Sequence, residues 1–594
     1  MELINLFADI NIKKDDFKYL ILLFIIASVI CFSKINHYLG MGFNYDVPVY
    51  LSNALYYAGI NYNILPIYWL NKAPTICFLT SLLFRLGFVS VKSLYLVTAA
   101  FEIAGIIGLY VFLKNRFDSI FSFLGCIFFM SIYLALVSFG SGMTDIPAIG
   151  VSVWILVFAV LSFNKNYKYF IITSLLFTVG VYIRPTVVLT LIPMFLYFLY
   201  KHDIIKLLYE LSDDRQLFKN NVNSYLKSEE FRYILISIVL CIVLYYTVRI
   251  ILFFVFNLPF NLLNSVTSSI SGYESLNGSD SAFNTDISTY ALSFLKMLSL
   301  RNISLFGIQW SWVIFFIIVF GLLLKAFKVM RNPGEYKILK DLSDKSPKFH
   351  GLLVTIIIIL IAISIIGYNL SYLLVEIAFV GMFALLSSFL KHFDENSDNE
   401  MFFIINVSWM CVYFIFISFI NIKLPRYLLP VFIPVTYLFV LSLESILTSI
   451  YNAFKKDNEN LKIIILKIIP IIFIFILLCT TYVTIDTTND IGQYTKNSKN
   501  YIGTQHVSNY LMKFDKNYMD KNITADLTCR YYNWFLKRPT NSINNQFEPI
   551  SKFDESKSDY LLLNESVKFE NYTDIYHYGI HHLYINNNLS DNSL

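Results

Sequence analysis

The chain has 594 residues and a mass of 69.0 kDa; 56% of its residues are hydrophobic and only 15% are charged. This composition, with a mean hydropathy of +0.59, excludes an ordinary soluble protein. The formal net charge of +5 is modest and the basic residues form no stripe, which excludes a nucleic-acid-binding protein. The composition therefore indicates a membrane protein.

Apolar runs recur along most of the chain, and many approach or exceed the roughly 20 residues that a helix needs to cross ~30 Å of hydrocarbon. The first run follows Lys13, Lys14 and Lys18, but its apolar core is longer than that of a signal peptide and no small-residue cleavage site follows. We interpret it as a retained anchor. About thirteen transmembrane helices are predicted, at residues 17–36, 90–113, 118–139, 145–163, 167–184, 185–200, 233–256, 306–326, 351–369, 371–391, 402–421, 427–447 and 461–484.

Basic residues are divided unevenly between the connecting loops. Residues 325–350 contain seven Lys and Arg residues and residues 201–231 contain five, whereas residues 37–72 contain one. Cytoplasmic loops carry the excess of Lys and Arg, so the first two loops are predicted to be cytoplasmic. One long span at 167–200 would place the basic 201–231 loop outside, and two short spans are therefore favoured. An odd number of spans places the two termini on opposite sides of the membrane. With the basic loops in the cytoplasm, this predicts a cytoplasmic N-terminus and an extracytoplasmic C-terminus in a multi-pass protein of the cell membrane.

The last part of the chain differs in composition from the rest. After residue 484 it becomes polar, with helix-like or strand-like pieces at 505–514, 522–527, 560–563 and 582–585. The predicted fold class is an all-α polytopic membrane domain with a small external C-terminal α/β domain. The membrane domain would comprise residues 1–484, including a first outer loop at 37–89 with interfacial helices. The extracytoplasmic α/β domain would comprise residues 485–594.

Ionisable residues gather on the predicted outer face, although they belong to loops far apart in sequence. Charge is costly in hydrocarbon, so groups at the ends of spans on one face are candidates for a functional site. Carboxylates can act as a general base or orient an acceptor, and cations can hold a phosphate by charge-assisted hydrogen bonds. These residue types suit displacement of a phosphate leaving group from a sugar. The set is Asp46, Lys72, Asp145, Arg184, Lys423 and Arg426.

Five short motifs contain these residues. They read FNYDVP around Asp46 with NKAP around Lys72, then SGMTDIP around Asp145, YIRP around Arg184, and KLPRYLLP around Arg426. In this order they resemble the GT-C glycosyltransferases related to dolichyl-phosphate-mannose protein mannosyltransferases and lipid A aminoarabinose transferases. The resemblance extends from Asp46 to Pro434, which is most of the membrane domain.

The resemblance implies a role for each residue. Asp46 would be the catalytic carboxylate, and Asp145 would support the acceptor or a metal. Lys72 and Arg426 would hold the phosphate of the donor lipid, with Arg184 and Lys423 as further members of that group. The reaction would be an inverting transfer of a hexosyl or pentosyl group from a polyprenyl-phosphate donor to an extracytoplasmic acceptor. That acceptor would be a protein, a glycan or a lipid, and no nucleic acid would be involved.

Two departures from the family pattern bear on metal binding. Asp46 is followed by Val47, where many relatives carry a second acidic residue, and Lys72 is followed by Ala-Pro instead of Pro-Pro. The first departure weakens the case for a metal at Asp46. A divalent metal therefore remains an open expectation, with no certain cofactor.

Each candidate also has a purely structural explanation. Asp46 could be a solvated loop residue or a helix cap, and Asp145 a first-turn carboxylate that favours its own helix. Lys72, Lys423 and Arg426 could be interfacial residues whose charged ends reach water. The alternative function is a polytopic transporter or a flippase for lipid-linked sugars, which predicts polar residues through the midplane and repeated halves. A third alternative is an inactive relative that serves as a scaffold.

Overall fold

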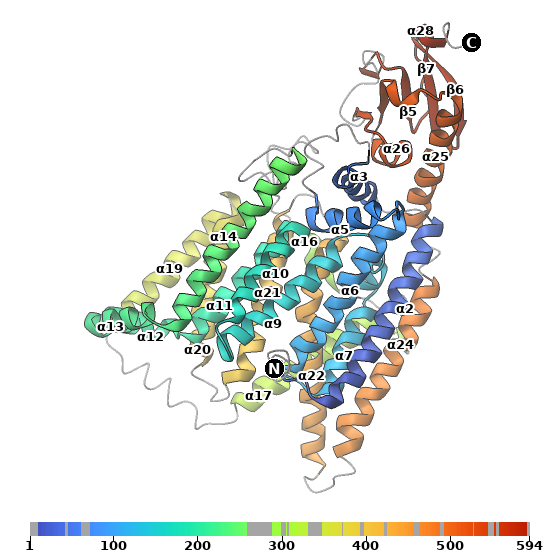
Figure 1. Ribbon diagram of the computed structural model, residues 1–594. Helices are drawn as coiled ribbons and strands as arrows, with labels where there is room; N and C mark the ends of the chain where they lie inside the picture. The colour runs from blue at the N-terminus through green and yellow to red at the C-terminus, as the bar shows by residue number, and fades with distance from the viewer. Residues whose placement is uncertain are drawn as a thin grey trace.

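The computed structural model describes residues 10–590, except for residues 42–45, 61–71, 258–287, 299–303, 306–307, 331–346, 371, 392–396, 421–423, 455–461, 488–491, 527, 544–551 and 554–556. A bundle of helices is followed by a small sheet at the C-terminal end (Figure 1). The predicted fold class is therefore confirmed, whereas the domain boundary at residue 484 stays a prediction.

Every predicted span coincides with helical residues. Seven helices among the described residues are long and apolar enough to cross a membrane, and shorter apolar helices accompany them. The predicted number of thirteen is not established by these criteria. The helices of this part are α2 (Phe17–Met41), α3 (Val47–Ala58), α5 (Pro74–Arg85), α6 (Val91–Lys114), α7 (Ser119–Ser131), α8 (Tyr133–Ser138), α9 (Asp145–Asn164), α10 (Tyr169–Ile183), η2 (Pro185–Thr190), α11 (Leu191–Lys201), α12 (Ile204–Asp213), α13 (Arg215–Leu226), α14 (Glu229–Phe256), α16 (Ser288–Met297), α17 (Trp310–Met330), α19 (Pro347–Leu370), α20 (Tyr372–Lys391), α21 (Ser397–Phe419), η4 (Pro425–Val431), α22 (Phe432–Ala453), η5 (Ile464–Ile468) and α24 (Ile469–Thr487).

Residues 167–200 form two helical segments that run in opposite directions, as predicted from loop charge. Arg184, after α10, contacts Asp145 at the beginning of α9. Lys201, at the end of α11, donates a hydrogen bond to the carbonyl of Phe163 near the end of α9. The chain therefore travels the length of α9 and back between residues 164 and 201.

Two regions differ from the sequence-based expectation. The span predicted at 118–139 is broken at Ile132, whose extended backbone separates α7 from α8. No proline or glycine marks this break, and we have no physical account of it.

The basic loop at 201–231 contains two helices, α12 and α13. At the beginning of each, an aspartate side chain accepts a hydrogen bond from a backbone N–H of the first turn.

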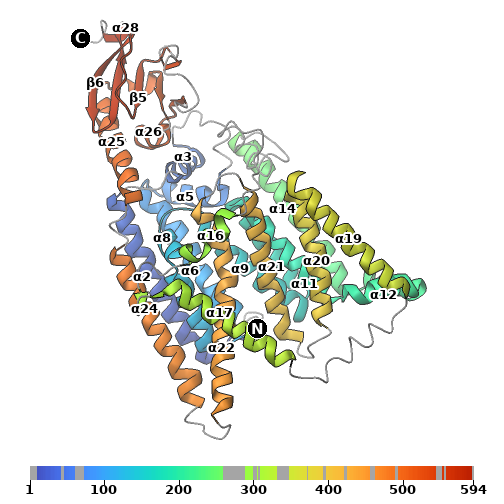
Figure 2. The same ribbon diagram turned by 180° about the vertical axis from the view of Figure 1, so that it is seen from behind.

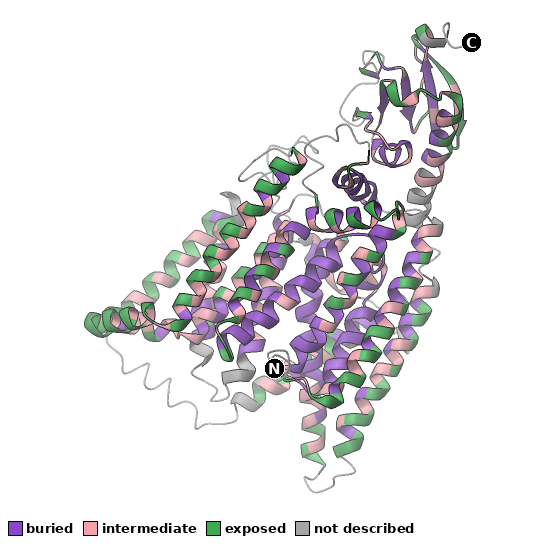
Figure 3. Cartoon of the chain, viewed as in Figure 1, coloured by how far each residue is buried: buried purple, intermediate pink, exposed green. Residues whose placement is uncertain are grey.

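Helix α9 is buried at the centre of the bundle, whereas the outer helices are largely exposed (Figure 3), and their exposed residues include many large apolar ones. In the most apolar stretch of α9, 89% of the residues are buried. The corresponding share is 11% in α14 and 22% in the span at Ile464–Ile485, which comprises η5 and most of α24. Apolar surfaces of this extent are stable in lipid but not in water. Gly105 of α6 faces Gly150 of α9 so closely that a Cβ on Gly105 would lie 2.6 Å from the Gly150 Cα. Small residues at such crossings let membrane helices approach.

The C-terminal sheet lies beyond one end of the bundle, with α3 and α5 between them (Figures 1 and 2). The described strands pair in the order β4-β3-β5-β7-β6, with β4, β3 and β5 parallel and β7 antiparallel to both of its neighbours. A separate short ribbon pairs β1 (Ser304–Leu305) with β2 (Ile308–Gln309). The C-terminal elements are α25 (Gly492–Phe514), η7 (Tyr518–Asp520), β3 (Ile523–Ala525), α26 (Cys529–Leu536), β4 (Asn541–Ser542), β5 (Tyr560–Leu563), β6 (Tyr572–Tyr578), β7 (His581–Asn586) and α28 (Asn587–Ser590).

The sheet region packs directly onto the membrane part. Helix α26 contacts α3, and the Trp534 ring lies against the Phe84 ring of α5 at a centroid distance of 6.3 Å. Val49 of α3 belongs to the same buried cluster as Val507 and Leu511 of α25. These contacts hold α26 next to the beginning of α3.

Candidate active site

Asp46 lies immediately before α3 and faces three cations. Its Oδ2 atom is 2.9 Å from Arg426 Nη2, and its Oδ1 atom is 3.5 Å from Arg530 Nη1 and 3.7 Å from Lys72 Nζ. The Asp46 side chain is 15% exposed, so these pairs are screened less than pairs on an open surface. One carboxylate therefore contacts cations that are 26, 380 and 484 residues away along the chain.

The local backbone leaves the Asp46 side chain available for these contacts. Its backbone carbonyl accepts the first hydrogen bonds of α3, from the N–H groups of Val49 and Tyr50. Its carboxylate caps no helix N–H, and Pro48 occupies the first turn, where a missing N–H costs nothing. The alternative that Asp46 is only a helix cap is thus not supported.

The cations also sit at the beginnings of helices. Lys72 precedes α5, and its carbonyl accepts a hydrogen bond from Asn53 Nδ2 of α3 at 3.2 Å. Arg426 lies in the first turn of η4, directly after Pro425. Proline suits this first position because it has no backbone N–H that would need a partner. The Lys72 side chain is 44% exposed, whereas that of Arg426 is 32% exposed.

A second ion pair lies at the beginning of α9. Asp145 Oδ1 is 2.5 Å from Arg184 Nη1, and the extended backbone of Arg184 separates α10 from η2. Asp145 is 5% exposed, and among the described residues its other oxygen, Oδ2, has no hydrogen-bond partner. A buried carboxylate oxygen without a partner carries a desolvation cost, which a ligand hydroxyl could relieve.

Tyrosine side chains connect the two ion pairs. The Tyr427 ring lies under both guanidinium groups, 5.7 Å from the carbon of Arg184 and 5.9 Å from that of Arg426. Tyr50 of α3 forms a hydrogen bond with the hydroxyl of Thr144, the residue before Asp145, at 3.4 Å. Asp46 and Asp145 thus belong to one continuous cluster.

The charges of this cluster favour an anion. The four cations Lys72, Arg184, Arg426 and Arg530 outnumber the two carboxylates, which leaves a formal charge of +2. Burial alone would raise the pKa of Asp46, but Lys72, Arg426 and Arg530 outweigh it and hold that pKa well below its usual range. Asp46 is therefore ionised and paired at neutral pH. The same excess of positive charge opposes a divalent cation, so these residues do not fit a metal at Asp46.

The structure brings together five of the six residues predicted from the sequence. Asp46, Lys72, Asp145, Arg184 and Arg426 lie at the same end of the bundle, and Lys423 lies outside the described residues. The sequence interpretation missed Arg530, because the polar tail was treated separately from the membrane part. The one available signal was the aromatic residues around it, Tyr531, Tyr532 and Trp534, which are typical of a helix near a membrane interface.

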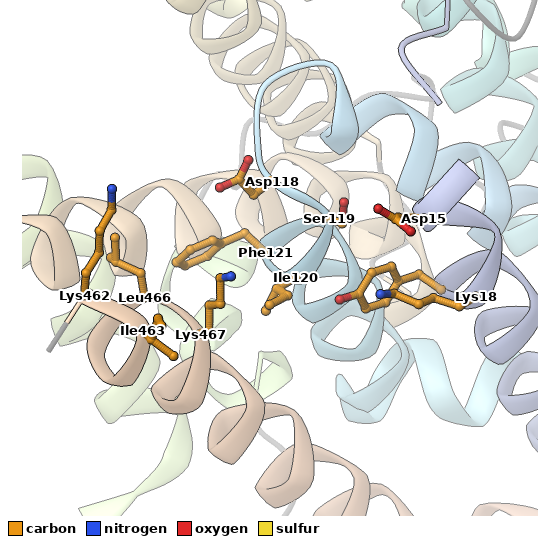
Figure 4. Close-up of a pocket in the computed structure, with 11 residues that line it drawn as sticks. Asp15, Lys18, Asp118, Ser119, Ile120, Phe121, Lys462, Ile463, Leu466 and Lys467 are labelled. Atoms are coloured by element: carbon orange, nitrogen blue, oxygen red, sulfur yellow. The ribbon is translucent and has the colours of Figure 1, made fainter. Parts of the chain in front are cut away.

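A cavity of about 510 Å³ opens at the other end of the bundle (Figure 4). It is lined by Lys18, Lys462 and Lys467 together with Asp15 and Asp118. Lys18 is near the beginning of α2, whereas Asp46 follows the end of that helix. This cavity is thus separate from the Asp46 cluster.

Comparisons with known proteins show which fold the chain shares. Residues 71–210 match a family model described as dolichyl-phosphate-mannose-protein mannosyltransferase. ArnT from Cupriavidus metallidurans bound to undecaprenyl phosphate aligns with 96% of this chain and 98% of its own, at 10% identity and a TM-score of 0.54. The chain has the GT-C fold. The apo structure of ArnT covers 96% of this chain and 97% of its own at 10% identity, with a TM-score of 0.50.

The GT-C resemblance inferred from the sequence is thereby confirmed. The family model includes Lys72, Asp145 and Arg184, whereas Asp46 and Arg426 lie outside its range. An archaeal oligosaccharyltransferase, AglB from Archaeoglobus fulgidus, is more distant, with a TM-score of 0.45 at 10% identity, and the alignment covers 93% of this chain and 70% of AglB. No curated protein sequence matches the chain.

Proposed function

We propose that this GT-C protein is a membrane glycosyltransferase that moves a hexosyl or pentosyl group from a polyprenyl-phosphate donor to an acceptor. The observation that supports this proposal most directly is the group of three cations around Asp46, which suits the phosphate of a lipid carrier. ArnT, which has the same fold, was crystallised with undecaprenyl phosphate. Bidentate arginine contacts suit phosphate oxygens, and lysine adds a compact charge.

In this proposal the donor phosphate takes the place of Asp46 as the partner of Lys72, Arg426 and Arg530. Its negative charge grows as the bond from the anomeric carbon to the phosphate oxygen breaks, and the cations stabilise that charge. Asp46 then loses part of the field that holds its pKa low. It becomes a better base for the hydroxyl proton of the acceptor.

The transfer is a single displacement that inverts the anomeric carbon. The acceptor oxygen attacks that carbon, its proton passes to Asp46, and the bonding electrons leave with the phosphate. A direct displacement of this kind needs no covalent sugar-enzyme intermediate. Asp145 Oδ2, which has no hydrogen-bond partner among the described residues, would accept a hydrogen bond from a hydroxyl of the acceptor or the sugar. Arg184 fixes the orientation of Asp145.

A transfer assay tests the proposal. Purified protein is incubated with membrane extract and radiolabelled polyprenyl-phosphate sugars, and Asp46→Asn is compared with Asp15→Asn. Asp15 is an exposed carboxylate at the other end of the bundle, so its variant is the control. General-base catalysis contributes about 10²–10⁴-fold, and we expect a loss of that order in Asp46→Asn alone. Undiminished transfer by Asp46→Asn would remove Asp46 from the mechanism.

A further inference from the structure

A cluster of histidine and aspartate side chains lies on the outermost hairpin of the C-terminal sheet, far along the chain from the Asp46 site. Asp574 and His577 belong to β6, and His582 belongs to β7. Each residue can offer one ligand atom, and these atoms all lie within 4.8 Å of one another. From this juxtaposition we propose that Asp574, His577 and His582 bind a divalent transition-metal ion such as Zn²⁺.

The pairing of the two strands brings the three side chains to one face. His577 is directly opposite His582, and Asp574 is opposite Tyr584, two residues further along the same face of β7. Residues three apart on a regular strand point to opposite faces. A bulge between Asp574 and Tyr576 adds one residue to β6 and turns Asp574 to the same face as His577.

The other face of β6 carries the packing of the hairpin. Tyr576 stacks on Tyr510 at a ring-centroid distance of 4.1 Å, and Tyr578 stacks on His506 at 4.0 Å, both against α25. The hairpin is therefore held in place without the cluster. Its three polar side chains are free of that packing role, so substitutions among them need not disturb the fold.

The geometry is close to that of a metal site. His582 Nδ1 and Asp574 Oδ2 form a hydrogen bond of 2.7 Å, which an ion would replace, and the His577 and His582 rings stack at a centroid distance of 5.4 Å and an interplanar angle of 23°. Zinc bond lengths of about 2.0–2.2 Å place tetrahedral ligand atoms about 3.3 Å apart. Small rotations of the exposed Asp574 and His577 side chains would bring the three atoms to that spacing around one ion.

The donor set indicates which ions fit. Two imidazoles and one carboxylate suit Zn²⁺, Cu²⁺, Ni²⁺ or Co²⁺, whereas Mg²⁺ and Ca²⁺ prefer oxygen ligands. Three protein ligands leave a fourth position for water. Because β6 is the edge strand of the sheet, an ion held here would tie that edge to β7. The site is independent of the proposed glycosyl transfer.

Titration calorimetry with Zn²⁺ tests the proposal. The full chain, purified in detergent without a polyhistidine tag and stripped with a chelator, should bind one ion per chain at this site. We expect His577→Asn and His582→Asn each to weaken that binding on the order of tenfold or more, and the double variant to abolish it. His202→Gln, which removes an imidazole that lies beside Glu230 and far from the hairpin, should leave the affinity unchanged.

Two further measurements keep the outcome decisive. Circular dichroism checks that each variant is folded, and X-ray absorption on the zinc-loaded protein should report two imidazole ligands. Binding that persists unchanged in the double variant would overturn the proposal, because the ion would then sit elsewhere. The absence of saturable Zn²⁺ binding by the folded wild-type chain would overturn it as well.

Discussion

At the scale of single residues, the unusual feature is one carboxylate shared by three cations. Asp46 contacts Lys72, Arg426 and Arg530 but carries only one negative charge. In a partly buried position, cations in excess of carboxylates are costly unless another anion joins them. The cluster is therefore better balanced when a further anion is bound, and in our proposal that anion is the donor phosphate.

A substitution of Arg530, which lies outside the motifs found in the sequence, tests whether this cluster binds the donor phosphate. Charge-assisted hydrogen bonds contribute roughly 1.5–3 kcal/mol, so Arg530→Gln should weaken donor binding by about 10–100-fold. The effect should appear mainly in the KM for the lipid donor in steady-state transfer assays. Arg538→Gln is the matched control, since Arg538 donates to the carbonyls of Tyr518 and Met519, within the C-terminal region. Equal KM values for both variants would exclude Arg530 from the donor site.

Five site residues could be predicted from the sequence because each lies at the end of an apolar run, next to a proline or within a recognisable motif. The sequence could not show which carboxylate pairs with which cation. Asp46 meets Arg426, 380 residues away, and Asp145 meets Arg184. Arg530 escaped prediction because its position depends on how α26 docks on α3.

At the scale of elements, hydrophobicity determined which helices could be predicted. Runs long enough to cross the bilayer coincide with described helices, including the two short ones at 167–200. The break at Ile132 and the short strand β4 carry no comparable signal, because two or three residues of changed backbone leave the composition unaltered. β6 was also missed, since its alternation is interrupted by the bulge after Asp574.

The crossing of α6 and α9 provides a prediction at this scale. A Cβ on Gly105 would lie 2.6 Å from the Cα of Gly150, which is backbone and cannot rotate away. Gly105→Ala should therefore force the helices apart and destabilise the protein by about 1–3 kcal/mol. A lower apparent melting temperature in detergent would report this loss.

Gly351 of α19 is the matched control for that substitution. A Cβ there meets no atom within 4 Å, so Gly351→Ala should be neutral or slightly stabilising, because alanine favours the helix. If Gly105→Ala melts at the same temperature as Gly351→Ala, the close approach of α6 and α9 contributes nothing to stability.

At the scale of the whole molecule, charged clusters occupy the two ends of the bundle. The Asp46 cluster lies at the end that carries the C-terminal sheet. Lys201, His202 and Glu230 meet at the other end, as do Arg116 and Glu444. In the topology predicted from loop charges, the end with the Asp46 cluster is the extracytoplasmic one.

Cysteine labelling tests that sidedness. In a cysteine-free background, Lys219→Cys in α13 and Asp520→Cys after α25 place one exposed thiol at each end of the molecule. A membrane-impermeant reagent applied to intact cells should label position 520 only, and position 219 should react after the cells are opened. Labelling of both positions from one side would contradict the topology.

The central claim is that the cations around Asp46 hold a polyprenyl phosphate. The most direct measurement is the equilibrium affinity of the purified protein for polyprenyl phosphate without a sugar. Arg426→Gln should weaken binding by about tenfold or more. Arg232→Gln, which removes an arginine that is 67% exposed at the other end, should not.

Asp46→Asn separates phosphate binding from general loss of structure. Because it removes the anion that competes for the same cations, it should bind polyprenyl phosphate at least as tightly as the wild type and yet fail to transfer sugar. An affinity that is the same in the wild type, Arg426→Gln and Arg232→Gln would contradict the account.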